Sequence, residues 1–187
     1  MLPICTTPGR ERTKRAKASQ KYGSENHQYF VDGSVTIHEV KFPDGQYKTV
    51  LVGGLGAGGK GYFALDVTCA GRLRTSDSAC DNSTLASPAD LVLWDKTLAT
   101  GDLTTDPDLG ASYGKPQSGK VCMTAFSPAS PCDPTNIKDV LVFGNGYNSA
   151  NSKAQLYVLE LQTGGILARI PTKNTTSNGL SAPFVDD

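Results

Sequence analysis

The feature that most constrains this fold is a strand-like segment that occurs twice, ninety residues apart. Lys48–Gly54 reads Lys-Thr-Val-Leu-Val-Gly-Gly, and Lys138–Gly144 reads Lys-Asp-Val-Leu-Val-Phe-Gly. Each is followed by a loop and a second strand pattern, Phe63–Val67 and then Tyr157–Leu161. Tandem units of this kind are typical of repeat folds, in which each unit packs on its neighbour.

Two more strand patterns complete each unit. Asp90–Trp94 corresponds to Ile166–Ile170, and a short run of small residues precedes each unit, at Gly33–Val35 and Gly114–Pro116. The order predicts an all-β fold made of antiparallel four-stranded blades, the unit of a modified β-propeller. A closed ring needs at least about four blades, so we expect a truncated propeller. The clearest strands are predicted at 34–40, 48–52, 62–67, 90–94, 138–143, 155–161 and 165–170.

Composition agrees with short strands joined by turns. The chain has 20 Gly and 11 Pro among 187 residues, and both residue types destabilise helix interiors. No segment carries an apolar stripe at helical spacing. Its 18 basic and 18 acidic side chains cancel, which argues against nucleic-acid binding, and its apolar runs are too short for membrane insertion.

The chain divides into two parts. Residues 1–24 are basic and poor in apolar side chains, which predicts a flexible segment, with a nucleic-acid arm or targeting segment as the alternative. Residues 25–187 form the partial propeller. We expect blade 1 at about 29–98, blade 2 at about 111–172 and the start of blade 3 at about 179–187.

The cysteines predict disulfides. Cys69 and Cys80 bracket a polar loop of ten residues, and Cys122 and Cys132 bracket one of nine. A local bridge in each loop indicates an extracytoplasmic protein, whereas four free thiols in the cytosol are the alternative. Neither pair has the CxxC spacing of a zinc site. Cys5 has no predicted partner.

The glycine-rich loop 53–61 mimics two phosphate-binding motifs. Gly54, Gly56 and Gly59 satisfy G-x-G-x-x-G, and Gly54, Gly59 and Lys60 satisfy most of a P-loop. Both motifs need a helix directly after the loop, but a strand pattern follows here. We therefore predict no cofactor and a structural role for the glycines of this loop and its repeat: Gly53, Gly54, Gly56, Gly58, Gly59, Gly61, Gly144 and Gly146.

No residue set predicts a metal site or catalysis. Asp106-Pro-Asp108 begins like a calcium loop, but Gly110 stands where the third acidic ligand belongs, and turn chemistry explains the segment better. His27 and His38 are the two histidines, and no serine lies in G-x-S-x-G. Paired carboxylates brought together by folding remain open.

Several stretches together resemble one known family, the PilY1/PilC type IV pilus tip adhesins. The similarity covers about residues 27–187 and involves the C-terminal propeller of those proteins. The stretches that carry it are His27–Ser34, Thr49–Thr68, Asp108–Gly110, Val142–Ser149, Leu156–Leu159 and Asn178–Pro183. Of these, the glycine-rich stretch and Gly-Asn-Gly-Tyr-Asn-Ser are the most specific.

The resemblance implies a non-enzymatic protein exported to the pilus tip, the cell surface or the periplasm. Its implied roles are pilus assembly, retraction control and surface adhesion, with pilin or minor pilins and a host or abiotic surface as partners. Calcium binding is implied for the full-length parent only, because no family calcium loop is complete in this chain.

Two alternatives stay open. Tyr157–Gly164 resembles the turns of quinoprotein dehydrogenase propellers, although Ala168 and Arg169 stand near the place where that class has a tryptophan, and Trp94 is the only one present. The other alternative is a truncated gene product without independent function.

Overall fold

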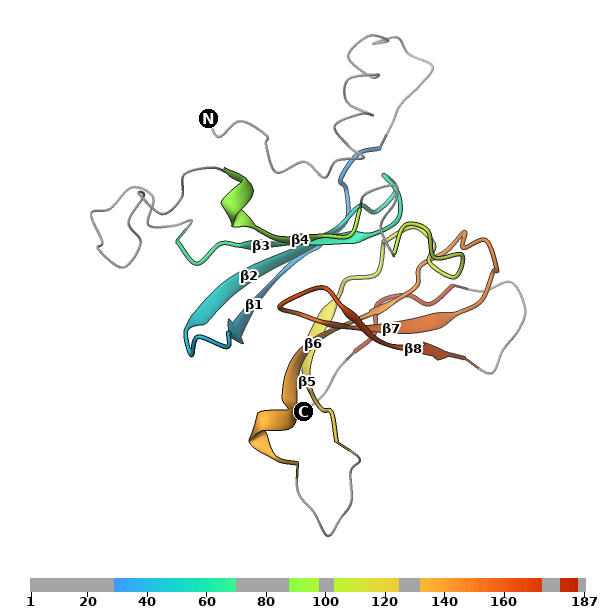
Figure 1. Ribbon diagram of the computed structural model, residues 1–187. Coiled ribbons are helices and arrows are strands. Elements are labelled where there is room, and N and C mark those ends of the chain that lie inside the picture. The colour runs from blue at the N-terminus through green and yellow to red at the C-terminus, as the bar shows by residue number, and fades with distance from the viewer. Residues whose placement is uncertain (1–28, 70–87, 98–102, 125–131, 173–178, 185–187) are drawn as a thin grey trace.

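The structure, a computed structural model, describes residues 29–69, 88–97, 103–124, 132–172 and 179–184. These residues form two four-stranded antiparallel sheets, in which each strand pairs with the next in sequence (Figure 1). Within the described ranges, the helical elements are the short 3-10 turns η2 (Pro88–Leu91) and η3 (Pro134–Asn136). The predicted all-β fold class is confirmed. None of the helices in the described ranges could span a bilayer.

The strands of the first sheet, here called blade 1, are β1 (Val35–Lys41), β2 (Tyr47–Gly54), β3 (Tyr62–Asp66) and β4 (Val92–Asp95). Those of the second sheet, blade 2, are β5 (Gln117–Cys122), β6 (Ile137–Gly144), β7 (Gln155–Glu160) and β8 (Ile166–Pro171). The N-terminal segment 1–24 lies outside the described residues.

The strand that opens blade 2 lies elsewhere than the sequence predicted. The prediction placed it at Gly114–Pro116, whereas β5 runs from Gln117 to Cys122. β5 is an edge strand in which Ser118, Lys120 and Val121 are exposed. Because neither of its faces is fully buried, its sequence shows no alternation of apolar and polar residues.

One hydrophobic core joins the two blades. Blade 1 contributes one face of its sheet, which we call its inner face, and blade 2 contributes what we call its docked face. Both faces belong to a single cluster of buried side chains. The Tyr62 and Phe143 rings meet across the joint with centroids 4.1 Å apart, and Tyr157 stacks on Phe143 at 5.5 Å. The main residues are Val50, Val52, Tyr62, Ala64 and Trp94 from blade 1 and Leu141, Phe143, Tyr157 and Leu159 from blade 2.

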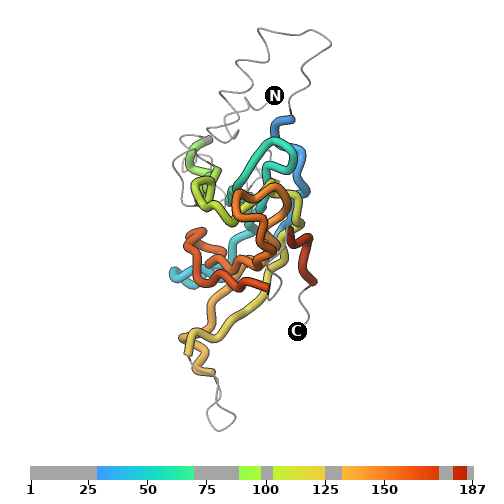
Figure 2. The backbone as a smooth tube through the Cα atoms, turned by 90° about the vertical axis from the view of Figure 1, so that its right-hand side faces the viewer, coloured from blue at the N-terminus to red at the C-terminus, as the bar shows by residue number. Residues whose placement is uncertain are grey.

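Polar contacts fix the angle between the blades. The Trp94 indole N–H donates to the Leu161 carbonyl (2.9 Å), and the Tyr62 hydroxyl donates to the Gly114 carbonyl (3.0 Å). Both bonds are buried, so both satisfy groups that would be costly to leave unpaired. Figure 2 shows the side view, in which the β5–β6 hairpin extends away from the rest of the described chain.

Candidate functional site

The glycine loops lie at one end of the blades, where five segments run side by side. We call this arrangement the loop stack; its members are 30–33, 55–59, 110–113, 145–147 and 179–181. Successive members are joined by backbone hydrogen bonds from Asp32 N to Leu55 O (3.5 Å), Gly56 N to Ser112 O (3.2 Å), Ala111 N to Tyr147 O (2.8 Å) and Gly146 N to Leu180 O (3.0 Å). Segments far apart in sequence therefore hold one another in register.

Glycines make this stack possible by letting backbones approach closely. Gly146 has a positive φ of 69°, and a Cβ there would collide with the Ala111 carbonyl oxygen. A Cβ at Gly58 would collide with the Phe30 carbonyl. The Gly56 N–H bonds Ser112 rather than pointing to an open cradle, and β3 follows the loop directly. The loop 53–61 therefore has the geometry of a connection between the strands β2 and β3.

The other predicted glycines are placed in the same region. Gly53 lies in β2 against the Phe63 ring, and Gly54 ends that strand beside Ser112. Gly59 and Gly61 have positive φ angles of 153° and 109°, while Gly144 at the end of β6 lies against the backbone of the 180–181 segment.

Asn145 is the residue that ties the stack together; the sequence placed it in the Gly-Asn-Gly-Tyr-Asn-Ser stretch but assigned it no role. It is fully buried. Its amide N–H₂ donates to the Asp108 (2.7 Å) and Lys153 (2.5 Å) carbonyls, and its amide oxygen accepts from the N–H groups of Gln155 and Leu180 (both 3.0 Å). One side chain thus binds the linker before blade 2, the loop within it and the segment after it.

An exposed group of tyrosines lies on the surface of this stack. Tyr113 and Tyr147 stack with ring centroids 5.0 Å apart and remain 42% and 48% exposed, and Tyr29, the first residue that the structure describes, is 52% exposed. A hydrogen bond with Tyr147, burial and the nearby Asp32 and Tyr29 raise the pKa of Tyr113 to about 12. We call Tyr29, Tyr113 and Tyr147 the tyrosine cluster. It was not predicted, because pairing of Tyr113 with Tyr147 depends on the stack.

The acidic loop is engaged in protein contacts. Arg169 Nε donates to Asp106 Oδ2 (2.8 Å), and Asp106 Oδ1 accepts the N–H of Asp108 (2.9 Å), whose own Oδ1 accepts from Asn151 (2.7 Å). Asp102, the acidic residue of the same segment before Asp106, lies outside the described residues. Across the described ranges, no three His, Cys, Asp or Glu side chains gather as metal ligands would. Asp106 and Asp108 therefore stabilise a turn, and Asp106 also forms an ion pair with Arg169.

The residues relevant to the quinoprotein comparison pack between elements. Arg169 lies over the Tyr157 ring, 5.8 Å from its centroid, in addition to pairing with Asp106. Trp94 is 6% exposed, and Gly164, with a φ of 68°, packs against its indole. Trp94 therefore stabilises the joint between the blades, whereas Arg169 ties β8 to the linker before blade 2.

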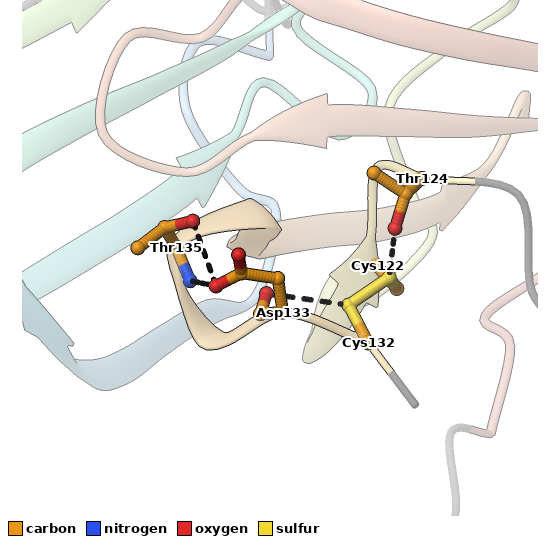
Figure 3. The surroundings of a disulfide bond; sticks show 5 residues. All are labelled: Cys122, Thr124, Cys132, Asp133 and Thr135. Carbon is orange, nitrogen blue, oxygen red and sulfur yellow. Dashed lines mark hydrogen bonds between the residues drawn. A yellow bond between two sulfur atoms is a disulfide. The ribbon is translucent and has the colours of Figure 1, made fainter. Parts of the chain in front are cut away.

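A disulfide joins Cys122 at the end of β5 to Cys132, as predicted, with the two Cα atoms 6.0 Å apart (Figure 3). The Thr124 hydroxyl donates to Cys122 Sγ (3.0 Å), since a disulfide sulfur has no proton to give. Asp133 caps η3 by accepting from Thr135 N (2.9 Å), and the bonds from Thr135 lower the pKa of that carboxyl. Cys69 is also disulfide-bonded; Cys80 and Cys5 lie outside the described residues, so the 69–80 pairing stays a prediction.

Replacing both Cys122 and Cys132 with serine is expected to lower the free energy of unfolding by about 2–3 kcal/mol, because a short closed loop regains entropy in the unfolded chain. Urea unfolding of the unreduced protein measures the change. Met123→Ser, an exposed substitution beside the bridge, serves as the control and should leave stability within about 0.5 kcal/mol. Equal stability of the double variant and the parent would show that the bridge does not stabilise the fold.

A groove of about 450 Å³ lies between the β1–β2 turn and the disulfide-closed hairpin. Four of its five charged groups bind one another: Lys138 pairs with Glu160 (2.6 Å) and Lys120 with Asp139 (3.2 Å), while Lys41 is the fifth. The bonds from Lys138 and Thr163 lower the pKa of Glu160. Because most of the charges in this groove are matched within the protein, the tyrosine cluster is the better candidate for contact with a partner.

Comparison with known proteins gives one consistent result. The family model described as PilY1 beta-propeller domain matches residues 11–187. The chain is 35% identical over 169 residues to the type IV pilus biogenesis factor PilY1 of Pseudomonas aeruginosa strain PAO1, and 36% identical over 165 residues to a PilY1 homolog of Xylella fastidiosa. These matches cover 89% and 88% of this chain but 11% and 10% of the relatives, so the chain spans about a tenth of their length.

The fold comparison agrees. The crystal structure of the Pseudomonas aeruginosa PilY1 C-terminal domain superposes with a TM-score of 0.57 at 34% sequence identity. The match covers 91% of this chain and 28% of that one. At 34% identity, the two chains are similar in sequence as well as in fold.

Proposed function

Since the chain belongs to the family of PilY1 β-propeller domains, we propose that it is a non-enzymatic, extracytoplasmic part of a type IV pilus biogenesis factor. The observation that carries this proposal is the family match over residues 11–187. The disulfide between Cys122 and Cys132 supports an extracytoplasmic location, because such bonds persist in oxidising compartments. Within that location, we propose the pilus tip, the cell surface or the periplasm.

Pilus assembly, retraction control and surface adhesion are the roles that we propose for the whole protein. Pilin or minor pilins are its proposed partners, together with a host or abiotic surface. We propose that the chain holds no cofactor, and that any calcium acts at other parts of the parent. Asp106 and Asp108 support this view, because they already bind Arg169 and Asn151.

A non-enzymatic role is supported by the contacts of those side chains that a catalytic site would have used. His38, which is part-buried, has its Nε2 2.7 Å from the Thr36 hydroxyl, and burial together with the nearby Lys115 lowers its pKa. Arg169 and Trp94, the residues of interest for quinone chemistry, are used in packing between elements. The relatives from Pseudomonas aeruginosa and Xylella fastidiosa are themselves type IV pilus biogenesis factors.

We propose that the tyrosine cluster contacts a pilin or minor pilin. Exposed aromatic side chains on loops held by a rigid scaffold are the residue type that dominates protein interfaces. Tyr113 comes from the linker before blade 2 and Tyr147 from the β6–β7 loop, and the loop stack holds their rings in stacked contact at an interplanar angle of 27°. The cluster is therefore a preformed surface that needs no ordering when a partner binds.

The test is a Tyr113→Ala/Tyr147→Ala double variant of the full-length parent, expressed from its own locus. Removing two interface tyrosines should reduce pilin cross-linking at least about thirtyfold, which corresponds to the loss of one interface hot spot, and should reduce twitching motility. Protein level is followed by immunoblotting. Met123→Ser, at an exposed position outside the cluster, is the matched control.

Three results would count against this assignment in different ways. Unchanged cross-linking of the double variant would remove the tyrosine cluster as the contact while leaving the family role intact. Dye-linked alcohol oxidation by the full-length protein, after incubation with a quinone, would instead favour the quinoprotein alternative. Normal piliation and motility after deletion of the locus would favour a product without independent function.

A further inference from the structure

The centre of the loop stack is an Asn-Gly dipeptide, Asn145-Gly146, and a second one follows at Asn178-Gly179. Asn-Gly is the sequence in which an asparagine side chain reacts most readily with its own backbone, because glycine has no Cβ to hinder the approach. Asn178 lies outside the described residues, whereas Asn145 is fully buried. Asn145-Gly146 therefore combines a reactive sequence with a closed position.

The reaction is a deamidation that needs no enzyme. The Gly146 backbone nitrogen attacks Cγ of Asn145, so that an N–Cγ bond forms and closes a cyclic imide while the Cγ–Nδ2 bond breaks. Nδ2 leaves as ammonia, together with the proton that the Gly146 nitrogen gives up. Water then opens the imide at either carbonyl, and the product is aspartate or isoaspartate. The attack needs a free Gly146 N–H and an Asn145 side chain that can rotate.

Neither requirement is met in the folded chain. Gly146 N donates to the Leu180 carbonyl (3.0 Å). The Asn145 side chain makes four hydrogen bonds, two donated by Nδ2 and two accepted by Oδ1. Rotation of the amide would break these bonds in a buried place, where unpaired groups are costly. Burial also keeps out the water that opens the imide.

Leu180 contacts both reacting groups. Its carbonyl accepts from Gly146 N, and its N–H donates to Asn145 Oδ1 (both 3.0 Å). Detachment of the segment 179–181 would therefore free the attacking nitrogen and release one side of the amide at once. Such local opening takes less free energy than unfolding of the whole domain. Among the members of the loop stack, this segment is the one that controls the reaction.

We propose that Asn145-Gly146 is a self-modification site, which the folded loop stack holds unreactive and which reacts when the stack opens. The product cannot rebuild the stack. A carboxylate has no proton to donate to the Asp108 and Lys153 carbonyls, which bind Nδ2 in the unmodified chain. Isoaspartate in addition lengthens the backbone by one methylene. Prolonged opening thus removes chains irreversibly from the folded population.

The first test compares the 187-residue chain folded and in guanidinium chloride, both in mildly alkaline buffer. Peptide mass spectrometry follows the conversion of each Asn-Gly pair. Both pairs should react at similar rates in denaturant, where conversion of Asn178 is the internal reference. Asn145 should react at least about a hundredfold more slowly in the folded chain, because the stack must first open. Equal rates for folded and unfolded Asn145 would overturn the proposal.

Leu180→Pro tests the role of the segment 179–181. Proline removes the N–H that Asn145 Oδ1 accepts, so Asn145 in the folded variant should convert at least about tenfold faster than in the parent. Leu180→Ala keeps both backbone bonds and should react as slowly as the parent. Circular dichroism checks that each variant is folded. Equal rates in the two folded variants would show that Leu180 does not protect the site.

A refolding measurement on the parent chain needs no variant. Chains aged in guanidinium chloride are diluted to refold, and size-exclusion chromatography separates compact from unfolded material. Asn145 should be unconverted in the compact fraction and converted in the unfolded one. The same extent of conversion in both fractions would mean that the modified chain rebuilds the stack, which contradicts the proposal.

Discussion

Replacing Asn145 with leucine is expected to lower the free energy of unfolding by about 3–5 kcal/mol, a large part of the stability of a small domain. Leucine is similar in size but offers no hydrogen bonds. The Asp108 and Lys153 carbonyls would lose their donor, and the Gln155 and Leu180 N–H groups their acceptor. Buried groups left unpaired each cost about 1–3 kcal/mol. Thermal and urea unfolding followed by circular dichroism measure the loss.

Asn151→Ala is the matched control for this substitution. Its side chain makes one exposed hydrogen bond, to Asp108 Oδ1 (2.7 Å), so its removal should cost less than about 1 kcal/mol. Asn145→Asp adds a second comparison, because a carboxylate cannot donate to the two carbonyls. If Asn145→Leu is no less stable than Asn151→Ala, the side chain does not hold the loop stack together.

Gly146→Ala is expected to be the second large effect, at about 3 kcal/mol or more. Two costs add at this position. An L-residue in the left-handed region costs about 1–2 kcal/mol, and the new Cβ would collide with the Ala111 carbonyl oxygen. Since Ala111 pairs with Tyr147, relief of the collision would pull the loop stack apart. The same unfolding measurements apply.

Gly45→Ala separates those two costs. Gly45 has a φ of 83°, yet nothing lies within 4 Å of a Cβ placed there. Its variant should therefore show the conformational cost alone, about 1–2 kcal/mol. If Gly146→Ala and Gly45→Ala lose the same stability, then close approach of the backbones in the stack is not the reason that position 146 needs glycine.

The sequence predicted the sheets well because strand patterns are local. Runs such as Lys138–Phe143 contain consecutive apolar, partly β-branched residues, and this pattern alone indicates a strand buried on both faces. The ninety-residue repeat then gave the order of strands. β5 was placed three residues too early at its start, since an edge strand with exposed side chains carries little hydrophobic signal.

The candidate site was predicted only in part. A run of glycines indicates unusual backbone geometry in the sequence itself. Because a strand pattern follows the loop 53–61, the sequence also indicated that this loop is a strand connection. Asn145 could not be recognised in the same way. Its importance comes from Asp108 and Leu180, 37 and 35 residues away, and a lone asparagine in a Gly-Asn-Gly turn is otherwise ordinary turn chemistry. The stacking of Tyr113 on Tyr147 depends on the same long-range contacts.

The position of Trp94 supplies the protein with an intrinsic optical probe. It is the single tryptophan of the chain, its indole N–H is bonded to Leu161 of the other blade, and Gly164 packs against its ring. Separation of the blades would expose that ring to water, whereas changes confined to the disulfide-closed hairpin would leave its surroundings intact. Tryptophan emission therefore reports specifically on the joint, and its comparison with circular dichroism distinguishes opening of the blades from melting of the sheets.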